Sequence, residues 1–296
     1  MPPKVIVILG PTATGKSDFA VRLAKDFDGE VISADSRQVY RDLDIGTGKI
    51  TRKEMCGVPH HLLSVANPKR VFSVTSYQKQ AARVTKDIFK RGKIPVVCGG
   101  TGLYISALVD GIIFPDVPPN AILRKKLSKK TAAELFATLS KLDQTRAETI
   151  DPHNPRRLIR AIEIAQSQGK STPLQKTVPY TAIKIGLDLP DEELRKKILA
   201  RIHARLKKGM LAEARRLQKQ GLSWKRMEAL GLEYRLLAQH LRGKLSKQEF
   251  VDVLAKEIWQ YVRRQRTWFR RDKSIVWFTP SQYTKLRSYV RAQLKR

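Results

Sequence analysis

The sequence has little of what marks membrane or secreted proteins. No apolar run approaches the ~20 residues that a helix needs to span a bilayer. There are only two cysteines, Cys56 and Cys98, and their separation fits neither a disulfide scaffold nor a zinc site. The chain runs from Met1 almost directly into an apolar stretch at 5–9, with no signal-peptide pattern. We therefore expect a cytoplasmic protein with no membrane association.

Acidic residues are scarce as well. The 27 Asp and Glu stand against 58 Lys and Arg, so the formal net charge is +31. Residues 191–296 alone carry 28 Lys and Arg and 10 Asp and Glu, a net charge of +18. Such a surplus favours binding to a polyanion such as a nucleic acid, because each neutralised phosphate releases counterions. A basic protein without a specific partner is the alternative that composition leaves open.

The most informative segment is a glycine-rich turn between an apolar run and an amphipathic stretch at 17–27. The turn consists of Gly10, Pro11, Thr12, Ala13, Thr14, Gly15, Lys16 and Ser17. It matches the phosphate-binding pattern G-x-x-x-x-G-K-[ST] in the strand–turn–helix context that this motif requires. The glycines permit a turn whose N–H groups point inward, Lys16 adds a cation, and Ser17 can hold a Mg²⁺ ion. The sequence therefore predicts a site for a di- or triphosphate.

Short apolar runs alternate with helical patterns along much of the chain. Strands are expected at 5–9, 30–34, 94–98, 181–189 and 274–278, and helices at 17–27, 75–91, 103–108, 191–220, 231–241 and 246–271. This alternation is typical of a parallel sheet with helices on both faces. We predict an α/β fold in which a P-loop NTPase-like parallel sheet is flanked by helices, with the core domain at 1–115 and 180–296.

The alternation is interrupted at the prolines of 115–119. From there the pattern is helical and basic, with helices expected at 121–130, 132–142 and 155–168. We predict that residues 116–179 form a helical insertion domain.

Two further polar residues follow predicted strands. Asp35 comes after the strand at 30–34, and Thr101 lies in the glycine turn after the strand at 94–98. The carboxyl ends of parallel strands meet at one edge of a sheet, so we expect both residues to share a crevice with the loop at 10–17. Asp35 can be a general base, a Mg²⁺ ligand or a cap, and Thr101 can donate to a phosphate or cap the next helix. No acid follows the strand at 94–98, which argues against a hydrolytic ATPase or GTPase.

Six sequence blocks occur in the order found in one enzyme family. They read GPTATGKS, ISADSRQVYRDLDIGTGK, GVPHHLLSV, GGTGLYISALVDG, DPHNPRRLIRAIEI and RRQRTWFR. They extend over nearly the whole chain, which resembles the tRNA dimethylallyltransferases (tRNA isopentenyltransferase family) of bacterial type. The resemblance implies transfer of a dimethylallyl group from dimethylallyl diphosphate to N6 of adenosine 37 in tRNAs that read codons beginning with U. It also implies that this base is flipped out of the anticodon stack.

The resemblance implies roles for individual residues. Asp35 would be the general base, Thr101 would stabilise the departing diphosphate, and Mg²⁺, the cofactor, would sit at Ser17. The diphosphate would be bound by the loop at 10–17 together with Arg205. Contacts with the anticodon stem-loop of tRNA are implied for Asp35, Ser36, Arg37, Gln38, Thr101, Arg124, Arg156, Arg157, Leu158, Ile159, Arg160, Arg263 and Arg264. The insertion domain would grip the stem.

The sequence departs from the family pattern in three places. The segment between Pro119 and Asp151 is shorter than usual, Gly231-Leu232-Glu233-Tyr234 replaces a glycine-aromatic-basic element, and Trp259 stands where arginine is common. The alternatives are a P-loop small-molecule kinase, which would bind ATP, a nucleic-acid-binding ATPase, and a prenyltransferase for free adenine nucleotides. The kinase and the nucleotide prenyltransferase do not need the basic C-terminal third, and the ATPase needs the missing acid. We expect a monomer.

Overall fold

The computed structural model describes residues 2–169 and 175–295. It divides into a core unit, Met1–Gly111 with Val178–Arg296, and a helical unit, Ile112–Thr177. The sequence places the corresponding boundaries at 115/116 and 179/180, and residues 170–174 of the predicted insertion lie outside the described residues. Among the described helices, none is long and apolar enough to cross a membrane.

The core unit is built on a six-stranded sheet in the order β3-β2-β4-β1-β5-β6, in which all neighbouring strands are parallel. The strands are β1 (Lys4–Leu9), β2 (Gly29–Ser33), β3 (His60–His61), β4 (Ile94–Cys98), β5 (Thr181–Leu187) and β6 (Val276–Phe278). In the central register Ile6 of β1 lies between Val96 of β4 and Ile183 of β5. The predicted α/β class with a P-loop-like parallel sheet is thus confirmed.

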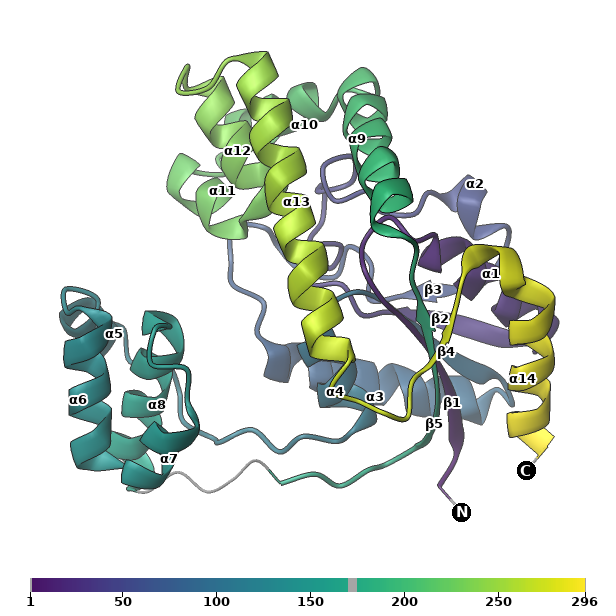
Figure 1. The fold of residues 1–296 in the computed structure, drawn as a ribbon, viewed down its shortest axis with the longest axis horizontal. Coiled ribbons are helices and arrows are strands. Elements are labelled where there is room, and N and C mark those ends of the chain that lie inside the picture. Colours follow the sequence, from purple (N-terminus) through teal and green to yellow (C-terminus); the bar gives the residue numbers. More distant parts are fainter. Residues whose placement is uncertain (1, 170–174, 296) are drawn as a thin grey trace. The chain divides into compact units, whose positions relative to one another are not determined.

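Alternate residues of β1 enter two different hydrophobic cores, as the pleat of a strand dictates. Val5, Val7 and Leu9 pack with α3 (Val74–Lys90), α4 (Gly102–Val109), α9 (Asp191–Lys207) and α13 (Lys247–Phe269). Ile6 and Ile8 pack with α1 (Lys16–Asp26) and α14 (Tyr283–Lys295). The sheet is therefore covered on both faces, with α1 and α14 together on one of them (Figure 1).

The remaining helices of the core unit are α2 (Arg52–Met55), α10 (Met210–Lys219), α11 (Trp224–Leu230), α12 (Leu232–Leu241) and the 3₁₀ turn at Pro280–Gln282. The single helix predicted at 191–220 is wrong, because Gly209 adopts a left-handed φ of 97° and separates α9 from α10. The sequence analysis also missed β3, α2, α11 and α14. The predicted start of α13 is confirmed, since the Ser246 side chain accepts a hydrogen bond from the N–H of Glu249.

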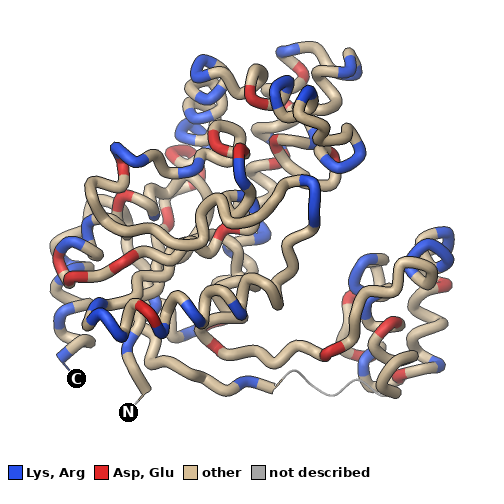
Figure 2. The backbone as a smooth tube through the Cα atoms, turned by 180° about the vertical axis from the view of Figure 1, so that it is seen from behind, with Lys and Arg blue, Asp and Glu red and all other residues tan. Residues whose placement is uncertain are grey.

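The helical unit consists of α5 (Ala121–Leu127), α6 (Ala132–Leu142), α7 (Gln144–Thr149) and α8 (Pro155–Gln168). Leu135 and Leu139 of α6 and Leu158 and Ile162 of α8 are fully buried and form its core. α7 was not predicted. Lys and Arg are distributed along the helices of both units, as Figure 2 shows for the whole chain. Helices thus carry much of the basic surplus of the sequence.

Candidate active site

The glycine-rich loop joins β1 to α1, as predicted. Gly10 has a φ of 135°, and a Cβ atom there would lie 2.2 Å from the carbonyl oxygen of Leu187 in β5. Gly15 has a φ of 85° at the residue that precedes α1. A side chain would be strained at both positions, and at Gly10 it would also collide with the neighbouring strand. The two fixed glycines of the motif are therefore required by the backbone itself.

Lys16 lies inside this loop. Its Nζ donates a hydrogen bond of 2.5 Å to the carbonyl oxygen of Pro11, which also accepts a bond of 3.0 Å from the Thr14 hydroxyl. Burial, helped by the nearby Arg201, lowers the pKa of Lys16 to about 8, while Asp35 acts in the opposite direction. A buried cation beside a second cation favours an anionic ligand, because the ligand would relieve their repulsion.

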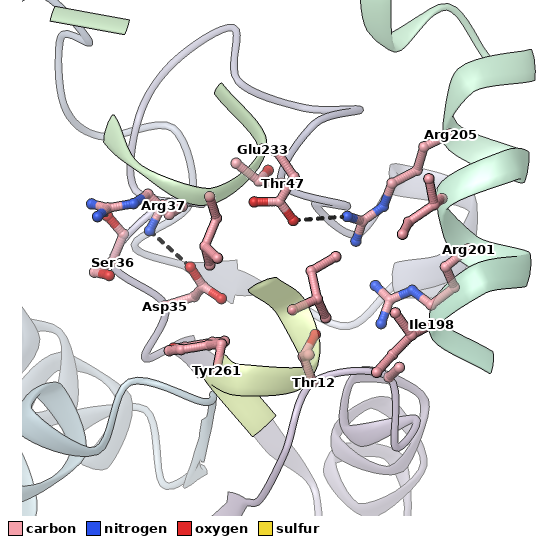
Figure 3. Close-up of a pocket in the computed structure, with 14 residues that line it drawn as sticks. Thr12, Asp35, Ser36, Arg37, Thr47, Ile198, Arg201, Arg205, Glu233 and Tyr261 are labelled. Carbon is pink, nitrogen blue, oxygen red and sulfur yellow. Dashed lines mark hydrogen bonds and ion pairs between the residues drawn. The ribbon is translucent and has the colours of Figure 1, made fainter. Parts of the chain in front are cut away.

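Two cavities of the core unit meet at this loop. The larger, of about 610 Å³, is lined by Lys16, Ser17 and Asp18, and the smaller, of about 110 Å³, by Ile198, Ile202 and Ile258. Both are lined by Thr12, Asp35, Arg201 and Tyr261, so they form one continuous crevice with a polar and an apolar part. Figure 3 shows the residues that line the smaller cavity. The cavities thus offer adjacent environments for a phosphate group and for a hydrocarbon chain.

Only one of the two carboxylate oxygens of Asp35 accepts hydrogen bonds from the described residues. Its Oδ1 accepts a hydrogen bond of 2.8 Å from the backbone N–H of Arg37 (Figure 3) and one of 3.2 Å from that of Gln38. No donor among residues 2–169 and 175–295 reaches its Oδ2. The residue therefore closes a turn with one oxygen, in agreement with the capping alternative, and its other oxygen has no hydrogen-bond donor among the described residues.

Thr101 links the turn after β4 to the turn after β2. Its hydroxyl accepts a hydrogen bond of 3.1 Å from the N–H of Ser36, and its own N–H donates to the carbonyl oxygen of Ala34. Thr101 stands at the N-cap position of α4, but its side chain does not cap that helix. Asp35 and the loop at 10–17 thus share the crevice as expected, and Thr101 lies next to Asp35 through its contact with Ser36. Thr101 itself is not among the residues that line the two cavities.

Arg205, which the resemblance assigned to the diphosphate, is held by protein groups. Its guanidinium donates to the carbonyl oxygen of Gly46 and to the carboxylate of Glu233, each at 3.2 Å. Arg201, one turn earlier on α9, lines both cavities and makes no hydrogen bond or ion pair with the described residues. Burial and the neighbouring Arg205 lower its pKa to about 10. The sequence analysis missed Arg201, although the i, i+4 spacing of the two arginines places them on one helix face.

A buried carboxylate, also missed, supports the wall that Arg205 contacts. Glu213 accepts hydrogen bonds from the N–H groups of three successive residues, Asp44, Ile45 and Gly46, and from the Tyr234 hydroxyl at 2.6 Å. No local pattern marks Glu213, because its partners are distant in sequence. It fixes the loop that presents Gly46 to Arg205.

In the helical unit, the residues predicted to contact RNA differ in accessibility. Arg156 and Arg157 are exposed at the start of α8. Arg124 and Arg160 both pair with the buried Glu163, at 2.7 and 3.1 Å. The inclusion of Leu158 needs correction, because its side chain is 0% exposed in the core of this unit and cannot reach a ligand. Ile159 is partly buried beside that core.

The other predicted positions lie in the core unit. Arg263 and Arg264 are exposed on α13, and the Arg264 guanidinium lies 5.8 Å from the centre of the Tyr261 ring. Arg37 lines the smaller cavity and Gln38 the larger one. Among the residues that the structure describes, no group of three or more His, Cys, Asp or Glu could hold a metal. A Mg²⁺ ion at Ser17 would therefore take most of its ligands from a bound phosphate and from water.

A parallel sheet with a glycine-rich loop before α1, and a cationic crevice at the carboxyl ends of its strands, defines an α/β protein with a P-loop-like fold. Comparison with known proteins narrows this class, since the family model "IPP transferase" matches residues 38–272. The chain belongs to the IPP transferase family.

Relatives and solved structures agree with this assignment. The chain is 40% identical to tRNA dimethylallyltransferase of Anoxybacillus flavithermus, over 93% of this chain and 90% of that protein. It is 43% identical to tRNA dimethylallyltransferase 2 of Treponema denticola, over 90% and 91%. The crystal structure of the full-length tRNA isopentenylpyrophosphate transferase of Bacillus halodurans matches with a TM-score of 0.76 and 34% identity, over 99% of this chain and 97% of that one. The resemblance seen in the sequence is thereby confirmed.

Proposed function

We propose that this protein transfers the dimethylallyl group of dimethylallyl diphosphate to N6 of adenosine 37 in tRNAs that read codons beginning with U. One observation carries the proposal: a phosphate-binding loop and an aspartate with a free oxygen share a crevice that also has an apolar part. A hydrolytic ATPase needs an acid after β4, and here Gly99 and Gly100 follow that strand. The family relatives named tRNA dimethylallyltransferase support the same reaction.

The diphosphate is assigned to the larger cavity. Lys16 supplies the buried charge, and Arg201, which has no hydrogen-bond or ion-pair partner among the described residues, supplies a second one. Arg205 extends this positive region while paired with Glu233. Mg²⁺ fits the oxygen-rich lining that Ser17 and Asp18 provide, and it would neutralise charge on the leaving diphosphate when bound.

The five-carbon chain is assigned to the smaller cavity. Its apolar wall comes from Ile198, Ile202, Leu232 and Ile258, which belong to three different helices. Burying a hydrocarbon chain there is favourable because it removes apolar surface from water. The carbon bonded to the diphosphate would then lie between the two cavities, beside Thr12 and Asp35, which line both.

In the reaction, the exocyclic N6 of the flipped adenine attacks this carbon while the carbon–oxygen bond to the diphosphate breaks. The electron pair of that bond leaves with the diphosphate, whose charge Lys16 and Arg201 offset. Asp35 accepts the proton that N6 loses, through the carboxylate oxygen that no protein donor occupies. Thr101 adjoins Asp35 through Ser36, and rotation of its hydroxyl would let it donate to the bridging oxygen of the diphosphate.

tRNA is the acceptor that the charge favours. The residues proposed to contact it are Asp35, Ser36, Arg37 and Gln38 in the crevice, Thr101 beside Ser36, and exposed arginines of α8 and α13. Residues 191–296 carry a net charge of +18, a surplus that binding a single adenine nucleotide does not require.

The test is prenyl transfer from labelled dimethylallyl diphosphate with unmodified tRNA, AMP and ATP as parallel acceptors. We expect label on tRNA alone, and none when adenosine 37 is replaced by another nucleotide. Label on AMP or ATP would instead assign the protein to the prenyltransferases of free nucleotides. Consumption of ATP without prenyl transfer to any acceptor would favour the kinase or ATPase alternatives and overturn the proposal.

A further inference from the structure

Gln265 is a polar residue buried inside the core unit, with 4% of its surface exposed. Its side-chain oxygen accepts a hydrogen bond of 3.0 Å from the N–H of Thr12, and its side-chain nitrogen donates one of 2.9 Å to the carbonyl oxygen of Gly100. Thr12 belongs to the phosphate-binding loop after β1, and Gly100 to the turn after β4. A single amide of α13 therefore connects the ends of two neighbouring strands.

The fit around this amide is close. A Cβ atom at Gly100 would lie 2.3 Å from Nε2 of Gln265, and one at Gly102 would lie 2.2 Å from Nε1 of Trp268. Tyr261 donates a longer hydrogen bond, of 3.4 Å, to the same carbonyl oxygen of Gly100. Tyr261, Gln265 and Trp268 follow the i, i+4, i+7 spacing of one helix face. This face of α13 thus packs directly against the turn at 99–102.

The turn that Gln265 holds leads to the proposed catalytic groups. Gly100 precedes Thr101, whose hydroxyl accepts from the N–H of Ser36, and Ser36 follows Asp35. On the other side, Thr12 lines both cavities. Gln265 is therefore the link between the loop assigned to the diphosphate and the turns that carry Thr101 and Asp35.

We propose that Gln265 is a positioning residue of the transfer reaction, which sets the separation between the diphosphate-binding loop and the turn that carries Thr101. The inference rests on the proposed function, because it concerns where the leaving group lies relative to Asp35. The Thr12 N–H already has a buried partner, so we assign it to holding the loop and not to binding phosphate. An apolar residue at 265 would leave this N–H unpaired and the Gly100 carbonyl with only the longer hydrogen bond from Tyr261, and the two turns would shift to find new partners.

The experiment compares Gln265→Met, which keeps the length but loses both hydrogen bonds, with Gln265→Asn, whose shorter amide reaches only one of the two turns. Gln260→Met is the matched control, because Gln260 is exposed on the same helix and makes no hydrogen bond with the described residues. Misplacement by ~1 Å lowers reaction rates by about 10²-fold. We expect a loss of about that size in kcat for Gln265→Met, a smaller loss for Gln265→Asn, none for Gln260→Met, and an unchanged KM for tRNA.

Urea unfolding of each variant separates positioning from a loss of structure. A kcat for folded Gln265→Met equal to that of the wild type, or a loss that only follows the unfolded fraction, would overturn the inference alone. Wild-type protein that transfers no prenyl group would overturn the proposed function and the inference with it. A second readout needs no activity: the amide hydrogen of Thr12 should exchange slowly in the wild type and faster in both Gln265 variants. Equal exchange rates would also overturn the inference.

Discussion

The guanidinium of Arg205 lies 3.2 Å from the carboxylate of Glu233, and the two side chains are only 12% and 14% exposed. The pair joins α9 to α12 at the wall of the smaller cavity. Glu233 stands where the family pattern has a basic residue. In the structure this unusual acidic residue pairs with Arg205. Arg205 also donates to the carbonyl oxygen of Gly46, which the loop held by Glu213 presents.

Removing one member of this pair should destabilise the protein. Glu233→Gln would leave Arg205 buried beside Arg201 without a counter-charge, and breaking a buried ion pair in this way costs about 3–5 kcal/mol. The double variant Arg205→Met/Glu233→Leu should regain most of that loss, because no buried charge remains unpaired. Urea unfolding of Arg205→Met, Glu233→Leu and the double variant measures the coupling. Losses that simply add in the double variant would contradict a direct interaction.

The fold could be predicted because its strands are short apolar runs that end in glycine or polar residues. Strands at 5–9, 30–34 and 94–98 were each found to within one residue at either end. α14 was missed because only Leu286 and Val290 of this helix are fully buried, too few to mark a helix in a basic segment. The break at Gly209 could have been predicted, because glycine readily adopts the left-handed φ at which helices commonly end.

The site residues could be predicted only where they belong to a local sequence motif or directly follow a predicted strand. The loop at 10–17 is such a pattern, and Asp35 and Thr101 could be placed from their positions after strands. Gln265 lies in a run of arginines and looks like part of an exposed basic segment in the sequence. Its burial depends on which face of α13 meets the turn at 99–102, and that is decided by tertiary packing.

Asp35→Asn should reduce turnover while preserving the local structure. The asparagine side-chain oxygen can still accept from the N–H groups of Arg37 and Gln38, so the turn is kept, but no carboxylate remains to take a proton from N6. General-base catalysis contributes about 10²–10⁴-fold, and kcat should fall by that amount with little change in tRNA affinity. Asp42→Asn, at an exposed carboxylate of the following loop, is the control. If Asp35→Asn keeps full turnover, another group is the base.

Diphosphate binding should weaken as the pH rises through about 8. The pKa of Lys16 is lowered to about 8 by burial, so in the free protein this side chain is charged below that pH and neutral above it. The charged form attracts the anion, and loss of the proton removes that attraction. Titration calorimetry with inorganic pyrophosphate in the wild type and in Lys16→Arg isolates the effect, because the ionisation of the ligand is common to both. Arginine stays charged, so its affinity should decline less, and identical pH profiles would exclude Lys16 as the cause.

The helical unit should lose stability in acid through Glu163. Burial raises the pKa of this carboxyl, but hydrogen bonds from Arg124, the N–H of Asn120 and Arg160 outweigh burial and leave the pKa below its ordinary value. Its stabilising effect is therefore present above pH 4.5 and lost as the pH falls through the lower folded value. Each hydrogen bond to a charged group contributes about 1.5–3 kcal/mol. Glu163→Gln should speed amide hydrogen exchange in α8 at pH 7 and reduce its acid sensitivity. A variant with wild-type exchange at both pH values would contradict this role.

The basic surface should make tRNA binding strongly dependent on salt. If about six phosphates are contacted, affinity should fall by roughly 10³-fold or more between 50 and 200 mM salt, because the release of counterions on binding gains less free energy at higher salt concentration. Arg156→Gln/Arg157→Gln removes two exposed cations at the start of α8, and each lost phosphate contact should lower the slope of log K against log salt by about 0.7–0.9. Lys285→Gln, at an exposed lysine of α14, is the matched control and should leave the slope unchanged. Filter binding at five or more salt concentrations measures all three slopes. A wild-type affinity that does not change with salt would mean that the charge of +31 does not serve RNA binding. Equal slopes for Arg156→Gln/Arg157→Gln and Lys285→Gln would mean that the start of α8 does not contact the RNA phosphates.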